Sequence, residues 1–333
     1  MIKAAVIGVG SMGKNHARVY RELSGASLVA ASDTNKSALA EVSSRFGCKA
    51  YTDYTEMLRK EEIDAVSIAV PTRMHSDIAL DCIEAGKHVL VEKPIADTEA
   101  NARKMIKAAS EAGVVLTVGH IERFNPAVSK LKKLMTEGKF GDVTSIMARR
   151  VGVFPPRIKD ANVFLDLAVH DIDIFNHLLG ERPREVYAKS GHALNSGRED
   201  HAIIALTYGE TTCVVQVNWL TPVKIRELAV TGTKGYGELN YITQELKVFE
   251  SNYETTYDSF GDFVVKFGSP REVVVEVEKT EPLKAELSHF IQCSMGRKEP
   301  AVTGEDALAT LAISKRAIES YRKDRVLEIK YDS

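Results

Sequence analysis

The sequence has few cysteines, one tryptophan and almost no net charge. Among its 333 residues, the four cysteines lie far apart, at positions 48, 82, 213 and 293, without a C-x-x-C pair. This spacing argues against a disulfide scaffold and against a zinc site, and it favours a protein of the reducing cytoplasm. The formal net charge of −2 gives no basis for binding nucleic acid or an anionic membrane surface.

Long apolar runs are missing as well. No run reaches the roughly 18 residues of a membrane-spanning helix, and the N-terminus enters a strand-like pattern at once. We therefore expect neither a transmembrane helix nor a signal peptide. Hydrophobic residues make up 44% of the chain, which is enough to bury a sizeable core, and the length suggests two domains or one large one.

The first 120 residues alternate short apolar runs with helical patterns. The runs stand at 3–8, 28–32, 65–70, 88–91 and 114–119, and the helical patterns at 12–23, 35–46, 54–60, 75–86 and 98–112. Strands that alternate with helices of this length predict βαβ units, and continuous apolar runs are typical of parallel strands covered on both faces.

The rhythm changes after Arg123. A helix is predicted over 125–137 and a strand over 143–151, followed by period-two segments up to 277 that indicate a mainly antiparallel sheet. Helical patterns at 282–295 and 304–322 close the chain, and Thr303 with Asp306 resembles a capping box. We predict an α/β protein with domains 1–120 and 121–333, in which the helix at about 304–322 packs back on the first domain.

A glycine-rich segment follows the first predicted strand. Gly8, Gly10 and Gly13 form G-x-G-x-x-G, in which glycines permit a tight turn and close approach to a pyrophosphate, at a helix N-terminus that supplies N–H donors. Asp33, 20 residues after Gly13, would accept hydrogen bonds from ribose hydroxyls and repel a 2′-phosphate. We predict an NAD site; a glycine turn without a ligand is the alternative.

Two further segments carry ionisable groups. Lys93 in Glu92-Lys93-Pro94 ends a buried-type strand, where open α/β sheets bind ligands; a surface lysine is the alternative, and Pro94 favours an extended or cis linkage. The stretch 164–180 is predicted as one helix with an ionisable stripe, made of Asp166, His170, Asp173 and His177. Metal binding, acid–base chemistry and structural hydrogen bonding are all open for this stripe. Four ligands on one straight helix cannot converge on one ion, so no metal site is predicted.

Together these segments resemble the Gfo/Idh/MocA oxidoreductases. The matching segments are the glycine loop with Asp33, V-P-T-R-M-H (70–75), G-K-H-V-L-V-E-K-P (86–94), G-H-I-E-R-F-N-P-A (119–127), D-L-A-V-H-D-I-D (166–173) and T-G-E-D-A-L (303–308). The resemblance implies a Rossmann domain, then an α/β domain with a large, open, mostly antiparallel sheet. It also implies hydride transfer between a nicotinamide and a hydroxyl-bearing carbon, and a homodimer or homotetramer formed through the open sheet face.

The resemblance also implies roles for residues. Lys93, Asp166 and His170 match the catalytic positions, with His170 as the general base and Lys93 as a rival candidate for that role; Asp173 would support them, and His177 would be structural. The cofactor would be held by Gly8, Gly10, Ser11, Met12, Gly13, Asp33, Pro71, Thr72, His75, Glu92 and Lys93.

The substrate is assigned from three segments of the second half. The segments 119–127, 149–160 and 218–226 look most like the branch that oxidises C3 of UDP-N-acetylhexosamines, and a diphosphate calls for cationic donors. The substrate-side residues expected are Arg123, Asn125, Arg150, Arg157, Asp166 and His170. The alternatives are an inositol or free-sugar dehydrogenase, and a sensor that binds NAD(H) without turnover.

Overall fold

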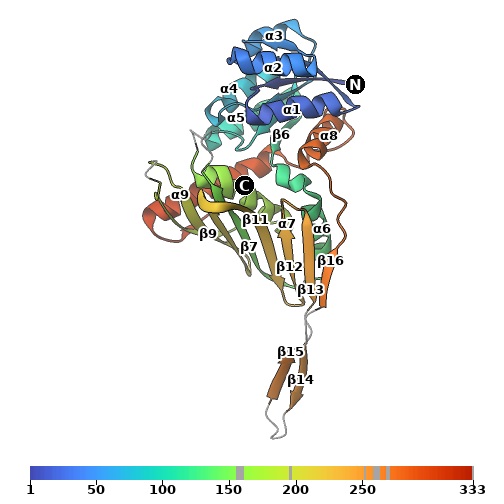
Figure 1. Ribbon diagram of the computed structural model, residues 1–333. Coiled ribbons are helices and arrows are strands. Elements are labelled where there is room, and N and C mark those ends of the chain that lie inside the picture. Colours follow the sequence, from blue (N-terminus) through green and yellow to red (C-terminus); the bar gives the residue numbers. More distant parts are fainter. Residues whose placement is uncertain (155–160, 195–196, 251–252, 258–262, 268–270, 332–333) are drawn as a thin grey trace. The chain divides into compact units, whose positions relative to one another are not determined.

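The computed structural model describes residues 1–154, 161–194, 197–250, 253–257, 263–267 and 271–331 of the chain (Figure 1). These residues form two compact units. The first unit consists mainly of Met1–Phe124 and Thr280–Lys315, and the second mainly of Asn125–Arg157, Asn162–Lys279 and Arg316–Ser333. Helix α9 (Gly304–Lys323) therefore contributes residues to both units.

A parallel sheet of six strands is the centre of the first unit, in the order β3-β2-β1-β4-β5-β6. Its strands are β1 (Ile2–Ile7), β2 (Ala26–Ser32), β3 (Lys49–Tyr51), β4 (Ala65–Ile68), β5 (His88–Glu92) and β6 (Leu116–Gly119). The helices that alternate with them are α1 (Ser11–Glu22), α2 (Lys36–Phe46), α3 (Tyr54–Lys60), α4 (His75–Glu84) and α5 (Glu99–Ala112). Because the strand order reverses between β1 and β4, a crevice for a ligand opens at their carboxyl ends.

The sequence pattern predicts this Rossmann arrangement correctly, since the central strands are buried on both faces. Every residue of β4 and β6 is buried, as the continuous apolar runs indicate. Strand β3 is missing from the prediction, because three residues of which none is buried carry too little hydrophobic pattern.

A C-terminal segment completes the first unit. Helix α8 (Pro282–Ser294) packs against α1, and the Thr117 hydroxyl donates to the Val302 carbonyl at 2.8 Å. The predicted capping box is present at the start of α9. The Asp306 N–H donates to Thr303 Oγ1 at 3.1 Å, and the Thr303 N–H donates to Asp306 Oδ2 at 3.3 Å. Two orphan donors at this helix end are thereby satisfied.

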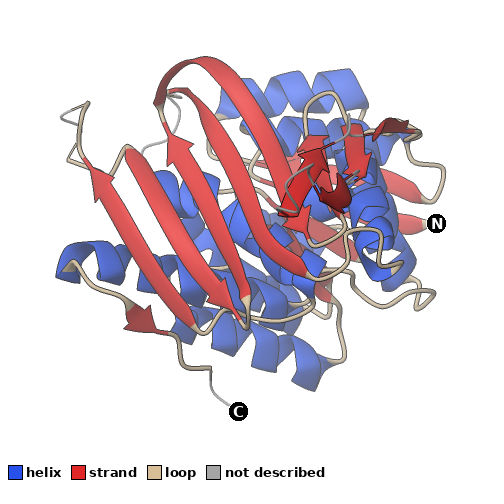
Figure 2. Ribbon diagram, turned by 90° about the horizontal axis from the view of Figure 1, so that it is seen from below, coloured by secondary structure: helices blue, strands red, loops and turns tan. Residues whose placement is uncertain are grey.

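The described part of the second unit forms a nine-stranded sheet in the order β16-β13-β12-β11-β7-β10-β9-β8-β17. Its strands are β7 (Val143–Val153), β8 (Glu185–Gly191), β9 (His201–Tyr208), β10 (Thr211–Asn218), β11 (Leu220–Gly232), β12 (Gly235–Asn240), β13 (Glu245–Glu250), β16 (Arg271–Val275) and β17 (Leu327–Glu328). Figure 2 shows its long strands side by side. All pairs are antiparallel except β7 with β10, so the prediction of a mostly antiparallel sheet is confirmed.

Helices α6 (Pro126–Thr136) and α7 (Val169–Leu179) contact this sheet. The single helix predicted over 164–180 is wrong in detail, because Phe164–Ala168 forms a π-helical turn and α7 begins only at Val169. A π-turn shifts the register of the side chains that follow it, and such turns are frequent at functional sites. The sequence pattern also does not predict the hairpin of β14 (Tyr253–Tyr257) and β15 (Phe263–Phe267).

Candidate functional site

The glycine loop in the first unit joins β1 to α1. Gly8 has φ +86°, and a Cβ on Gly13 would lie 1.8 Å from the Gly8 carbonyl oxygen, so only glycine allows the helix to pack this closely on the turn. A Cβ on Gly10, by contrast, would meet no atom within 4 Å. The open side of the loop is therefore at Gly10, directly before Ser11 and Met12 in the first turn of α1. This is the side where the helix N–H groups can bind a pyrophosphate.

Asp33 lies directly after β2 and ties the loop to the next helix. Its Oδ2 accepts the N–H of Val9 at 2.7 Å, and its Oδ1 accepts the N–H of Asn35 at 2.7 Å. Asn35 in turn caps α2 through its side chain. The carboxylate is thus held by main-chain donors at the end of the second strand, where a ribose hydroxyl would bind. The glycine loop and Asp33 together fit an NAD molecule.

Lys93 follows β5 and is partly exposed, with a cis peptide bond to Pro94. The preceding Glu92 accepts the Lys93 N–H at 3.2 Å, and its Oε1 lies 3.1 Å from Nε2 of His16 in α1. Burial alone would raise the pKa of Glu92, but the hydrogen bond and charge of His16, then the charge of Lys93, hold that pKa below its usual value. An ionised Glu92 therefore holds the backbone at Lys93. His16 thus supports Glu92, although the sequence pattern gives no sign of this role.

His75 connects two loops rather than facing outward. Its Nδ1 lies 2.9 Å from the carbonyl oxygen of Pro94 and its Nε2 lies 3.0 Å from that of Val70, and the side chain is 1% exposed. Burial lowers the pKa of His75, and a neutral imidazole has a single N–H to donate. One of the two carbonyls therefore accepts this N–H, and the buried His75 ring packs between the segment that ends at Val70 and the segment that carries Lys93.

Two residues expected on the substrate side make polar contacts within the protein. Arg123 Nη1 donates to Asp306 Oδ2 at 2.9 Å and to the Ala301 carbonyl at 3.0 Å, within the first unit. Asn125, in the second unit, accepts the Ala127 N–H at 3.1 Å as the cap of α6, and it donates to the Tyr241 carbonyl at 3.0 Å. Both side chains therefore hold neighbouring segments in place.

Asp166, His170 and His177 are the partly exposed members of the ionisable stripe in the second unit. Asp166 lies in the π-turn, where its Oδ2 accepts the indole N–H of Trp219 at 3.3 Å. Asp173 is 1% exposed, and Nδ1 of His177 lies 3.4 Å from Nζ of Lys132. The structure thus buries Asp173 and leaves the other three side chains partly exposed. Among the residues that the structure describes, no three His, Cys, Asp or Glu side chains are grouped so as to hold a metal ion.

Arg150 lies inside the second unit. Its guanidinium donates to Asp171 at 2.7 Å and 3.1 Å, and the two residues are 4% and 0% exposed. Arg150 also stacks on the Tyr241 ring at 4.9 Å. The sequence pattern gives no sign of this pair, because Asp171 falls on the apolar side of the predicted helix. Arg157, the other cation expected near a diphosphate, lies outside the described residues.

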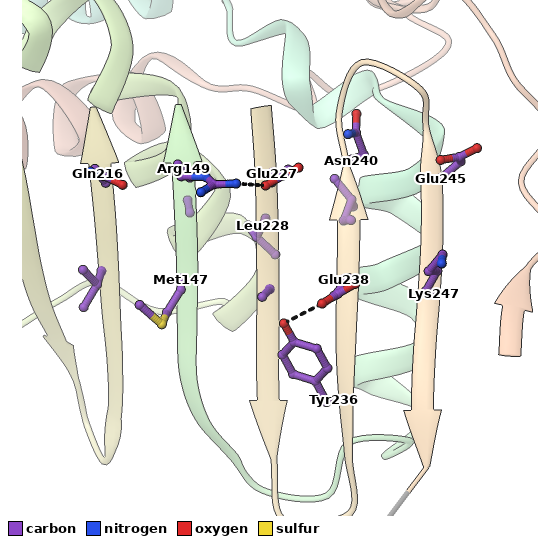
Figure 3. A pocket seen from close by; sticks show the side chains of 14 residues that line it. Met147, Arg149, Gln216, Glu227, Leu228, Tyr236, Glu238, Asn240, Glu245 and Lys247 are labelled. Atoms are coloured by element: carbon purple, nitrogen blue, oxygen red, sulfur yellow. Dashed lines mark hydrogen bonds and ion pairs between the residues drawn. The ribbon is translucent and has the colours of Figure 1, made fainter. Parts of the chain in front are cut away.

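A hollow of about 550 Å³ lies on the open face of the large sheet. Figure 3 shows the side chains of β7, β11 and β12 pointing toward the viewer, with Arg149 paired to Glu227 and Tyr236 to Glu238. Exposed Met147 lies beside this ion pair and this hydrogen bond. None of the residues expected in the catalytic or cofactor site lines the hollow, so its position suits a binding surface better than a reaction centre.

No helix in the described part of the chain combines the length and apolar character needed to cross a bilayer.

Comparison with known proteins matches both halves of the chain to one family. Residues 2–120 match the model of the oxidoreductase family with an NAD-binding Rossmann fold, and residues 128–238 match the GFO/IDH/MocA C-terminal domain. UDP-N-acetylglucosamine 3-dehydrogenase of Acidithiobacillus ferrooxidans is 28% identical over 96% of this chain and 98% of its own. Myo-inositol 2-dehydrogenase of Thermotoga maritima is also 28% identical, over 98% of this chain and 99% of its own.

A solved structure of the Acidithiobacillus ferrooxidans enzyme superposes with a TM-score of 0.84 at 26% identity, covering 97% of this chain and 98% of that one. Strand order, glycine loop and family models agree with one another. The chain belongs to the Gfo/Idh/MocA family of NAD-binding oxidoreductases.

Proposed function

We propose that the protein oxidises a secondary hydroxyl of a nucleotide sugar with NAD, with C3 of UDP-N-acetylglucosamine as the best candidate. The observation that carries this proposal is the similarity to UDP-N-acetylglucosamine 3-dehydrogenase over nearly the full length of both chains. The partly exposed Asp166 and His170 support it, because alcohol oxidation needs a proton acceptor that solvent and substrate can reach. The equal identity to myo-inositol 2-dehydrogenase makes an inositol the second candidate.

In the proposed reaction, the glycine loop and Asp33 would hold NAD, which would supply the acceptor for the hydride that leaves the hydroxyl-bearing carbon. His170 takes the hydroxyl proton, so that one C–H and one O–H bond break while a C=O bond forms. A histidine suits this task because its ordinary pKa lies near neutrality. Lys93 stabilises the negative charge that develops on the oxygen, and Asp166 binds the substrate or positions His170.

A substrate panel separates these candidates. NADH formation is followed at 340 nm with UDP-N-acetylglucosamine, its uronic acid, myo-inositol and free glucose. We expect the highest kcat/KM with a nucleotide sugar. Preference for myo-inositol would support the second candidate, and NADH binding without turnover on any of the four would favour a sensor.

Two variants test the residue roles. His170→Ala should lower kcat by about 10²- to 10⁴-fold, as expected for loss of a general base, and Lys93→Met should lower it at least as much. The affinity for NADH, measured by fluorescence titration, should change far less for His170→Ala. Near-normal turnover in either variant would remove that residue from the mechanism.

We also propose that copies of the chain associate through the open sheet face. The exposed apolar residues Met147, Ile203 and Val274 lie on β7, β9 and β16 of this sheet, and exposed apolar surface of this kind marks interaction sites. Met147→Glu should shift the mass measured by light scattering toward the monomer. Val326→Glu, at an exposed apolar residue just before β17, is the control and should leave the mass unchanged.

All four cysteines are buried free thiols. Reduced cysteines are usual in the cytoplasm, and we propose that compartment for the protein.

A further inference from the structure

The chain contains one tryptophan, and it contacts a residue of the proposed catalytic set. Trp219 stands between β10 and β11, is 3% exposed, and donates its indole N–H to Asp166 Oδ2 at 3.3 Å. The two residues are 53 positions apart in the chain. A buried indole N–H needs an acceptor, and here that acceptor is a partly exposed carboxylate in the π-turn.

Both ends of this hydrogen bond are fixed by the same short segment, Glu199–Asp200. On one side, the Asp166 N–H donates to the Asn162 carbonyl at 2.9 Å, and the Asn162 side chain donates to Glu199 Oε2 at 2.8 Å. On the other side, the Trp219 N–H donates to the Asp200 carbonyl at 2.9 Å. The indole and the carboxylate are therefore held in register by a common anchor.

The indole ring is also held from the side. The ring of Phe154 meets it edge-on, with 5.3 Å between ring centroids and 73° between ring planes. The Arg198 guanidinium lies 5.9 Å from the centroid of the Phe154 ring. Edge-to-face aromatic pairs resist rotation of either ring, so the N–H vector toward Asp166 is well defined.

A carboxylate can rotate to exchange its two oxygens, and a donor directed at one of them distinguishes the two. We propose that Trp219 is a positioning residue, whose indole N–H fixes the rotamer of Asp166 that the oxidation uses. This inference rests on the proposed function, because it takes Asp166 to contact the substrate or His170. It adds Trp219, which is 53 positions from Asp166 in the chain, to the residues proposed to affect the rate of oxidation.

A double-mutant cycle tests the link. Trp219→Phe removes the N–H and keeps an aromatic ring, and it should lower kcat by about tenfold, the loss typical of a hydrogen bond to a charged group. In an Asp166→Ala background the same change should alter kcat by less than about twofold, because its partner is gone. The affinity for NADH should stay constant in all four proteins. Equal losses in both backgrounds would mean a structural role only, and would overturn the inference.

Fluorescence gives a readout that does not need turnover. Since Trp219 is the only tryptophan, the emission spectrum should differ between the wild type and Asp166→Asn, which keeps the size of the side chain and removes its charge. If the wild type turns over a sugar but its emission spectrum equals that of Asp166→Asn, the link between Trp219 and Asp166 is overturned and the proposed function stands. The difference without turnover on any sugar would overturn the proposed function, and with it the catalytic use of Trp219.

Discussion

Arg150 and Asp171 form a buried ion pair with two hydrogen bonds, at 2.7 Å and 3.1 Å, between β7 and α7. Removing one partner leaves an uncompensated charge in the protein interior. Arg150→Met should therefore lower the free energy of unfolding by about 3–5 kcal/mol, as measured by urea denaturation.

The adjacent arginine is a matched control for this prediction. Arg149 pairs with Glu227 at 2.7 Å on the sheet surface, with both side chains about half exposed. Arg149→Met should cost less than about 1 kcal/mol. A normal stability of Arg150→Met, combined with a raised KM for the nucleotide sugar, would instead support the substrate role expected from the sequence.

Glu286 in α8 predicts an unusual dependence of stability on pH. The side chain is 2% exposed, and neither of its oxygens has a hydrogen-bond partner among the described residues. Burial, and then the negative charge of Glu92, raise the pKa of Glu286 well above its usual value. The folded chain thus keeps a proton that the unfolded chain releases above about pH 4.5. Stability is therefore lost as the pH rises from there toward the folded-state pKa.

Glu286→Gln removes this penalty while keeping the shape of the neutral acid. The variant should be more stable than the wild type at pH 7, since each pH unit between the unfolded-state and folded-state pKa values contributes about 1.4 kcal/mol. The gain should vanish near pH 4 in thermal unfolding. Glu84→Gln, at an exposed residue of α4, should show no such pH-dependent gain; a similar gain there would contradict the assignment to burial.

An alanine should affect stability at Gly13 and NADH binding at Gly10. Gly13→Ala places a Cβ 1.8 Å from the Gly8 carbonyl, so the loop must move, and the melting temperature should fall by several degrees. Gly10→Ala meets no atom within 4 Å and should keep its melting temperature, but it should weaken NADH binding by tenfold or more because the methyl group occupies the pyrophosphate side. Unchanged affinity in Gly10→Ala would place the dinucleotide elsewhere.

The sequence pattern predicts what is encoded locally. Each of three patterns in the first unit can be recognised within a window of about 20 residues: the glycine loop, its distance to Asp33, and the alternation of apolar runs with helical patterns. The parallel sheet is therefore predictable from the hydrophobic periodicity. The capping box at Thr303 and Asp306 is equally local. A capping box satisfies the same helix N–H groups whatever the surrounding fold, so it can be predicted from the sequence.

Contacts between distant segments cannot be predicted from the local sequence pattern. Trp219 with Asp166, Arg150 with Asp171, and His16 with Glu92 each join segments whose pairing depends on sheet order and register. The π-turn at Phe164–Ala168 is local, but it differs from an α-helix by one inserted residue, and the apolar pattern does not distinguish the two. These are the features that determine which ionisable groups are buried and which are accessible.

The choice between NAD and NADP depends on Asp33. Its carboxylate accepts main-chain N–H groups from Val9 and Asn35 at 2.7 Å each, and its charge opposes a 2′-phosphate. Asp33→Ala should weaken NADH binding by about 10- to 100-fold, the loss expected for hydrogen bonds to a charged group. The variant should also have a smaller or reversed preference for NADH over NADPH. Fluorescence titration with both cofactors measures this. Lys36→Ala, at an exposed residue of α2 that could assist a phosphate, should leave NADH affinity unchanged. Tighter binding of NADPH than of NADH by the wild type would contradict this role of Asp33, because the carboxylate would then face the phosphate that it should repel.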